Sequence, residues 1–355
     1  MKKYLNKGLL YMWFNAAKVP VMLGLILWGF IANSILRSQL WRVRNDIAYS
    51  GVDYFQSIDL SNYIFLGFIF LGIYFIAGGI NKRNTTMFLS SGPYTKKQIK
   101  YNELIGLLLT LALFVIEYIY IAITFYIRNA QLLSIVNGYT NIIAIEIVRV
   151  ILFGIIGITF MLIVDTLFSN SVISVLAMTL VIPESIMLII GDLYSALRYF
   201  GVGNGESLAN KINTFIYGSR ENVYIPNPLL DSIGMNQITT KRLILSILST
   251  IIVVLVMLVL FNIAQKKYKL EGGNKIFSSK KNENIMVILS SIAVGILAQL
   301  LILDGYVSRL VYRTGEFLPL VGGELIKVMC LWIIVICVFG FIAYKIIKKV
   351  IKTVA

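Results

Sequence analysis

Ionisable side chains interrupt the long apolar runs of this sequence at four positions, Glu117, Glu146, Arg149 and Glu184. A charge at membrane depth is costly and commonly faces a protein interior or a water-filled cavity, so each position is a functional candidate. Carboxylates accept protons and cations, and a carboxylate beside an arginine forms a strong charge-assisted hydrogen bond. These residue types therefore offer charge pairing or substrate passage within a membrane.

The spacing of three of these residues predicts one cluster. At a rise of about 1.5 Å per residue, Glu117 and Arg149 lie at similar depths on neighbouring antiparallel spans. Glu146 precedes Arg149 by three residues and shares its helix face, so it offers the arginine a second partner. Two interpretations remain open: an ion pair that fixes helix packing, or a group that takes part in substrate passage or gating.

Pro183 stands directly before Glu184. A proline within a helix removes a backbone hydrogen bond, so it predicts a kink or a broken helix in the fifth span. One hypothesis is that Pro183 and Glu184 form a gate. The alternative is a simple kink near the outer surface, where Glu184 reaches water.

Motifs for catalysis are missing. The chain has no histidine, which excludes imidazole ligands and bases. Cys330 and Cys337 are seven residues apart, about 10 Å along one helix, which is too far for a disulfide. The patterns GxxxxGK[ST], GxSxG, HExxH and CxxC do not occur. We therefore expect a chain that is not an enzyme, with no nucleotide site, metal or cofactor of its own.

The composition defines the class of protein. Hydrophobic residues make up 58% of the 355 residues and charged residues only 14%, against about a quarter in soluble proteins. The basic residues stand beside apolar runs instead of forming a stripe with aromatics, which argues against nucleic acid as a partner. We expect an all-α polytopic membrane protein with about eight transmembrane helices. The runs long enough to span a bilayer are 19–36, 61–80, 104–126, 139–163, 171–191, 243–264, 285–303 and 325–344.

The net charge of +15 indicates orientation in the bilayer. Lysines are enriched in the short connections of one side, which predicts that this side and both termini are cytosolic. The predicted organisation is an N-terminal interfacial helix (1–18), a six-helix core (19–264) with outer segments 37–60 and 192–242, a basic cytosolic linker (265–284) and a C-terminal two-helix hairpin with its tail (285–355).

The loop between the second and third spans shows more local structure than a plain connector. Thr95 and Gln98 have the spacing of a capping box, which predicts a helix start at this point. Gly92 and Pro93 end whatever helix precedes them, because proline disfavours helical geometry in the residue before it. The loop therefore predicts a helix end and a separate helix start within a few residues.

A short helix is expected before this break. Asn84 or Thr85 is a suitable N-cap, and the helix runs for two turns through Ser91. A separately capped helix on a membrane loop is typical of a docking element. Its apolar residues are Met87, Phe88 and Leu89.

The stretch TTMFLSSGPYTKKQI at 85–99 resembles the loop between the second and third spans of ABC-2-type exporter permeases. This resemblance is specific only in the loop, although the general layout of the first 280 or so residues is also similar. Met87 stands where many members carry a glutamate, and the basic family has six spans. The residues that carry the resemblance are Thr85, Phe88, Leu89, Ser91, Pro93, Thr95, Lys96, Lys97, Gln98 and Ile99.

The resemblance implies the permease subunit of an ATP-driven exporter in a bacterial cell membrane. A separate ABC ATPase subunit would carry ATP and Mg²⁺, and a second permease half, identical or different, would complete the pathway among membrane lipids. Residues 84–91 would be the coupling helix, and the substrate an amphipathic peptide, a lipid or a hydrophobic drug.

Two other classes remain alternatives. The membrane carboxylates Glu117, Glu146 and Glu184 suit an ion-coupled secondary transporter, which inverted internal repeats would favour. A lipid-modifying membrane enzyme or a sensor that uses the outer segments is the other alternative.

Overall fold

The computed structural model describes residues 6–51, 53–78, 82–202, 206–208, 227–234, 236, 238–267, 276–313 and 315–354. Within these residues, eight helices are long and apolar enough to cross a membrane. The predicted all-α class with eight candidate spans is confirmed, and it indicates a multi-pass membrane protein. The one described strand pair, β1 (Gly201–Val202) with β2 (Glu206–Ser207), is a minimal antiparallel hairpin.

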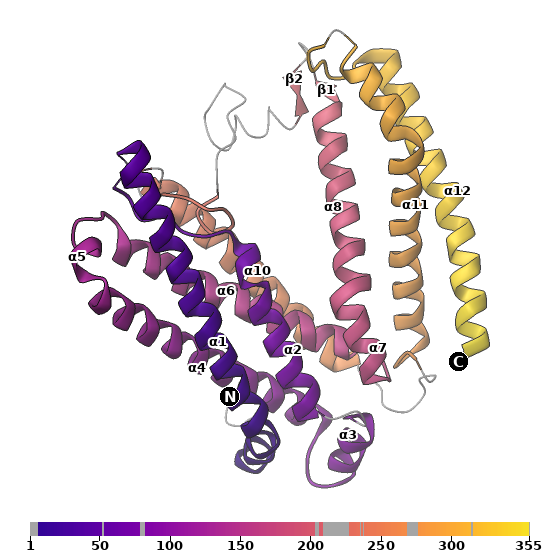
Figure 1. Cartoon of the computed structure of the whole chain (residues 1–355). Coiled ribbons are helices and arrows are strands. Elements are labelled where there is room, and N and C mark those ends of the chain that lie inside the picture. The colour runs from indigo at the N-terminus through magenta and orange to yellow at the C-terminus, as the bar shows by residue number, and fades with distance from the viewer. Residues whose placement is uncertain are drawn as a thin grey trace. The chain divides into compact units, whose positions relative to one another are not determined.

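The helices follow one another along the chain as Figure 1 shows. Their bounds are α1 (Lys7–Ser50), η1 (Leu60–Tyr63), α2 (Ile64–Gly78), α3 (Lys82–Ser91), α4 (Lys96–Arg128), α5 (Ala130–Leu133), α6 (Tyr139–Asp165), α7 (Ser171–Leu176), η2 (Ala177–Val181), α8 (Ile182–Tyr199), α10 (Thr240–Lys267), α11 (Lys280–Val311) and α12 (Gly322–Val354).

The chain divides into two compact units. The first unit contains Met1–Thr166, Asn170–Val172 and Ile225–Leu270, and the second contains Leu167–Ser169, Ile173–Tyr224 and Glu271–Ala355. This grouping differs from the predicted six-helix core and two-helix hairpin, because the fifth span belongs with the last two. The contacts within the second unit explain the difference.

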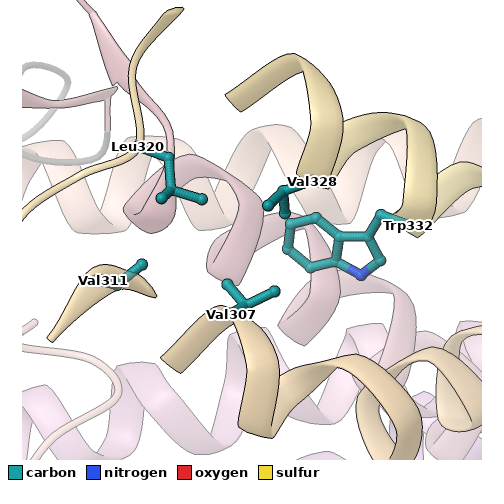
Figure 2. Packing of buried hydrophobic residues seen from close by; sticks show 5 residues of the cluster. All are labelled: Val307, Val311, Leu320, Val328 and Trp332. Carbon is teal, nitrogen blue, oxygen red and sulfur yellow. The ribbon is translucent and has the colours of Figure 1, made fainter. Parts of the chain in front are cut away.

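The core of the second unit joins α8 to the terminal helices. Figure 2 shows its buried residues, with Trp332 of α12 beside Val307 of α11. The end of α8 packs against this cluster, where the Phe200 ring meets the Trp332 ring edge-on at 5.5 Å. A backbone hydrogen bond also holds the C-terminal end of α8, because the Leu320 N–H donates to the Tyr199 carbonyl at 2.8 Å. Aromatic packing and backbone pairing together therefore hold the fifth span to the hairpin.

Within the hairpin, α11 and α12 make a close backbone contact at Gly295. A Cβ on this glycine would stand only 2.5 Å from the Ile336 carbonyl oxygen. Any larger residue would therefore force the two helices apart. The predicted pairing of the last two spans is present, while residues 268–275 of the basic linker lie outside the described residues.

In the first unit, α1 is one helix of 44 residues. The sequence predicted a separate surface helix at 1–18 and an outer segment from 37, but the helix begins at Lys7 and continues to Ser50. Pro20 lies inside it without ending it. The helix continues because both ends bury apolar side chains, Leu9 and Ala17 near the start and Leu40 and Val43 near the end.

The fifth span contains a change of helix type. The α-helical turns of α7 pass into the π-helical segment η2, and α8 follows with Pro183 in its first turn. Pro183 has no N–H, so it cannot make the α-helical hydrogen bond to the carbonyl of Thr179, and wider turns take up the mismatch. The predicted disturbance at Pro183 is therefore present as a π-helical segment.

Candidate functional site

Arg149 of α6 is completely buried, and its guanidinium binds oxygen atoms of two other chain segments. Nη1 donates to the Ile58 carbonyl. Nη2 donates to the carbonyls of Pro228 and Asp231 at 2.7 and 2.6 Å and contacts the Ser57 hydroxyl at 3.3 Å. The charge of Arg149 is therefore stabilised by backbone dipoles, an arrangement that the planar fork of five donors favours.

The two segments bound by Arg149 also pair with each other. Ser57 N–H donates to the Ile233 carbonyl and Leu60 N–H to the Leu230 carbonyl, both at 2.9 Å. The Ser232 hydroxyl donates to the Ser57 carbonyl at 2.7 Å. Segments 53–60 and 227–234 thus pair with each other, and Arg149 binds one carbonyl of the first segment and two of the second. Irregular backbone beside a membrane span requires such partners.

Glu146, one helical turn before Arg149, is also fully buried. Its carboxylate accepts a hydrogen bond from Gln39 Nε2 of α1 at 2.6 Å and another from the Tyr118 hydroxyl of α4. Gln39 in turn donates to the Gln56 carbonyl at 3.1 Å. We define the Arg149 cluster as Arg149, Glu146, Gln39, Ser57 and Tyr118.

The Arg149 cluster confirms that Glu146 and Arg149 occupy one buried polar region, but the predicted Glu117–Arg149 pair is wrong. No described ion pair joins the two residues. Tyr118, the next residue of α4, is the side chain that reaches Glu146. Successive residues are about 100° apart around a helix, so Glu117 points elsewhere. Its carboxyl faces α1 at Gly29.

Glu184 belongs to the second unit, where it follows Pro183 on an exposed face of α8. The neighbouring Ser185 hydroxyl donates to the Val181 carbonyl at 2.6 Å and so covers part of the disturbed backbone. Glu184 lies in the first turn of α8, three residues after the π-helical segment. Its role as a gate stays a prediction.

The loop helix α3 is present, and it ends at Ser91 as predicted. The capping box at the start of α4 is confirmed: Gln98 N–H donates to the Thr95 hydroxyl at 3.2 Å, and Thr95 N–H donates to Gln98 Oε1 at 3.0 Å. The helix begins at Lys82, two residues earlier than predicted, so Asn84 and Thr85 lie inside it and neither caps it. The side chains of these two residues lie outside the described ones.

The described side chains of α3 divide into a covered and an exposed set. Thr86 is buried and Leu89 is half-buried, whereas Phe88 is 77% exposed and Met87 is also exposed. Thr86 and Leu89 line a cavity of about 170 Å³ whose other walls come from the starts of α1 and α4 and the end of α2. The helix therefore rests on three spans and directs Phe88 outward.

Lys100 links the start of α4 to the end of α6. It is 1% exposed, and Nζ lies 2.8 Å from Asp165 Oδ2 and 3.1 Å from Glu103 Oε2. In the sequence this lysine is one of several basic residues that indicate only membrane orientation. Asp165 is 65 residues away in the chain, and a pair at that separation leaves no local sequence signal.

Within the described residues, no group of three or more histidine, cysteine, aspartate or glutamate side chains is placed to hold a metal ion. Comparison with models of protein families, with curated proteins and with solved structures finds no match to this chain. The functional argument therefore rests on the geometry of the Arg149 cluster, α3 and Glu117.

Proposed function

We propose that this chain is the membrane-spanning subunit of an ATP-driven exporter of the ABC-2 type, and that α3 is the helix on which a separate ATPase docks. The observation that carries the proposal is the exposed Phe88 on a short helix outside the spans. Aromatic residues on an exposed helix face are typical anchors in a partner's groove. A loop that only oriented the chain would need lysines, but no outward-facing aromatic.

The base of α3 is suited to passing force into the membrane. The turn at Gly92 and Pro93 is followed at once by the capping box, so a short link from α3 leads directly into the hydrogen-bonded start of α4. One turn further along α4, Lys100 ties that helix to Asp165 of α6. A displacement of α3 therefore acts on two spans through direct contacts.

The remaining parts of the proposal follow from what the sequence lacks and from its charge. The chain has no P-loop motif, so ATP and Mg²⁺ belong to the ATPase subunit. In this proposal α3 and both termini lie in the cytosol of a bacterial cell, an orientation that the lysine-rich connections support. A second permease half and the surrounding lipids complete the pathway for an amphipathic peptide, a lipid or a hydrophobic drug.

One observation favours a second candidate, an ion-coupled secondary transporter. Glu117 Oε2 is buried and has no hydrogen-bond partner among the described residues. A lone membrane carboxyl of this kind is suited to carry a proton. This candidate requires no ATPase, so the two functions separate in a single experiment.

The experiment is co-purification of the full chain, expressed with the products of neighbouring genes, followed by ATP-hydrolysis assays in lipid nanodiscs. We expect a P-loop ATPase to bind and to be lost when Phe88 is changed to Asp. Tyr49→Asp is the matched control, because Tyr49 is 88% exposed at the other end of α1. Equal behaviour of the two variants, or no ATPase in gentle detergent, would contradict the proposal.

A further inference from the structure

The cavity between α3 and the spans has room for a small molecule. Its volume is about 170 Å³. An apolar cavity of about 150 Å³ is large enough to hold benzene, so this one accommodates a single aromatic ring with a small substituent. We name it the α3 cavity and define it by Trp13 of α1, Tyr74 of α2, Leu89 of α3, and Asn102 and Glu103 of α4.

The walls of the α3 cavity differ in polarity. The residues from α1 and α2 are mostly apolar and include two aromatic rings, Trp13 and Tyr74. Asn102 and Glu103 make the α4 wall polar. The Asn102 amide is held in place, because its Oδ1 accepts from the Asn6 N–H at 3.2 Å and its Nδ2 donates to the Gln98 carbonyl at 2.8 Å. A carboxylate offers about four acceptor sites and an amide oxygen about two, so a donor in the cavity meets acceptors on this wall.

The charges at the α4 wall favour an uncharged ligand. Lys100 Nζ lies 3.1 Å from Glu103 Oε2 and 2.8 Å from Asp165 Oδ2. An anionic ligand would meet the like charge of Glu103, and a cationic ligand would meet that of Lys100. A hydroxyl group instead donates a charge-assisted hydrogen bond to the carboxylate without adding a charge. The cavity therefore suits a neutral aromatic ring that carries a hydroxyl group.

Helix α1 provides the shortest route into the α3 cavity. Met12 and Ala16 line the cavity one helical turn apart, and both reach the molecular surface. The methionine side chain is unbranched and adapts readily to its surroundings. A small molecule therefore passes α1 without separating the spans.

We propose that the α3 cavity binds a small phenol, and that the bound ring holds α3 against the spans. The ring packs between Trp13 and Leu89, and aromatic pairs of this kind favour stacked or edge-on contacts. The hydroxyl donates to Glu103 or Asn102. Because Leu89 belongs to α3 and the other walls to three spans, the occupant contacts all four helices at once. The binding site stands without the ATPase, whereas control of coupling through α3 rests on the proposed exporter function.

The test follows the quenching of Trp13 fluorescence by 4-bromophenol, whose heavy atom quenches an indole at contact distance. The full chain is placed in phosphatidylcholine nanodiscs. Trp13 is the only one of the chain's four tryptophans, all of them described, that lines the cavity. Partition of the phenol into lipid gives quenching in proportion to its concentration, whereas a site gives a component that saturates. We expect a saturable component that Trp13→Phe removes.

The isostere 4-bromotoluene carries a methyl group in place of the hydroxyl. At equal concentration in the membrane it should bind about tenfold more weakly than 4-bromophenol, because it makes no hydrogen bond to the α4 wall. Equal binding of the two compounds would indicate an apolar occupant, such as a lipid acyl chain, and would overturn the proposal.

Two variants locate the site. Ala77→Leu adds an isopropyl group at a lining residue of α2 and should weaken binding of 4-bromophenol at least about tenfold. The unfolding midpoint of this variant should not fall, since the larger side chain fills space. Ala112→Leu is the matched control, because Ala112 lies on an exposed face of α4 outside the lining, and its affinity should stay unchanged.

Amide hydrogen exchange measures the effect on α3. Bound 4-bromophenol should slow exchange in residues 86–91 by about threefold and leave α5 unchanged. Quenching without a saturable component, undiminished affinity in Ala77→Leu, or exchange in α3 that changes no more than in α5 would each overturn the proposal. None of these outcomes depends on an ATPase, so they are distinct from a failure of the exporter function.

Discussion

The Arg149 cluster and helix α3 belong to the same unit but differ in the burial of their side chains. In the cluster, charged groups are completely buried, and protein oxygens surround the guanidinium. In α3, an aromatic side chain is left exposed on a helix whose other side is anchored. The cluster is therefore suited to hold chain segments together, whereas the exposed side of α3 is the surface proposed to bind the ATPase.

The difference shows that a charge within a membrane span is an incomplete sign of function. The same argument selected Arg149 and Glu117 from the sequence, yet the two Nη atoms of Arg149 have four hydrogen-bond partners and Glu117 Oε2 has none among the described residues. The number of satisfied contacts separates a structural charge from a reactive one. Substitutions in the two regions should therefore change different measurements.

The largest loss of stability is expected for Arg149→Met. The change removes the arginine donors to the Ile58, Pro228 and Asp231 carbonyls and the positive charge near Glu146, at a cost of about 3–5 kcal/mol. The thermal unfolding midpoint of the detergent-solubilised chain measures it. Arg128→Met, at the exposed end of α4, is the matched control. Equal midpoints for the two variants would show that the buried Arg149 stabilises the fold no more than the exposed Arg128 does.

Lys100→Met should have the next largest effect, about 2–3 kcal/mol, because Asp165 and Glu103 lose a partner but keep some contact with solvent. Lys97→Met is the control. It removes another lysine of the same helix, whose ammonium lies over the Tyr101 ring at 5.6 Å. A double-mutant cycle with Asp165→Asn isolates the pair. Additive effects in that cycle would show that the ion pair contributes nothing.

Thr95→Ala should cost about 1 kcal/mol, the usual value of an N-cap. The Thr95 hydroxyl accepts a hydrogen bond at the start of α4, whereas the Thr124 hydroxyl only donates to carbonyls of its own helix. Thr124→Ala is therefore the control, and its midpoint should stay near that of the unchanged protein. If both variants unfold alike, the capping box does not stabilise the link between α3 and α4.

Phe88→Ala should change stability least, within about 0.5 kcal/mol, because the ring is exposed. Binding of the ATPase should nevertheless weaken by about 2 kcal/mol, the loss typical of an aromatic anchor. The measurement is the affinity of the purified ATPase for the chain in nanodiscs. A large fall in the unfolding midpoint with unchanged affinity would show that Phe88 stabilises the fold and does not bind the ATPase.

Local signals in the sequence were the reliable ones. The Thr95–Gln98 box and the break at Gly92 and Pro93 depend on residues a few positions apart, and the structure contains both. The disturbance at Pro183 is likewise local, because it follows from one missing N–H. The eight apolar runs are recovered as candidate spans for the same reason.

Interactions between distant segments were not predictable. Arg149 binds backbone carbonyls of Ile58 and Pro228, and backbone acceptors have no residue signature. The rotation of α4 about its axis decides whether Glu117 or Tyr118 reaches Glu146, and depth along a span does not reveal it. The length of α1 was missed because the predicted span stops at the first charged residues, although the buried face continues.

The length of α1 has a mechanical consequence. At about 1.5 Å per residue its 44 residues extend for roughly 66 Å, twice the hydrocarbon thickness of a bilayer. Trp13 packs against Gly106 near one end, and Gln39 holds Glu146 toward the other. A rigid tilt of about 5° about the first turn of α1 would therefore move its far end by about 6 Å. Any such rotation beside α3 would be largest near the segments that Arg149 holds.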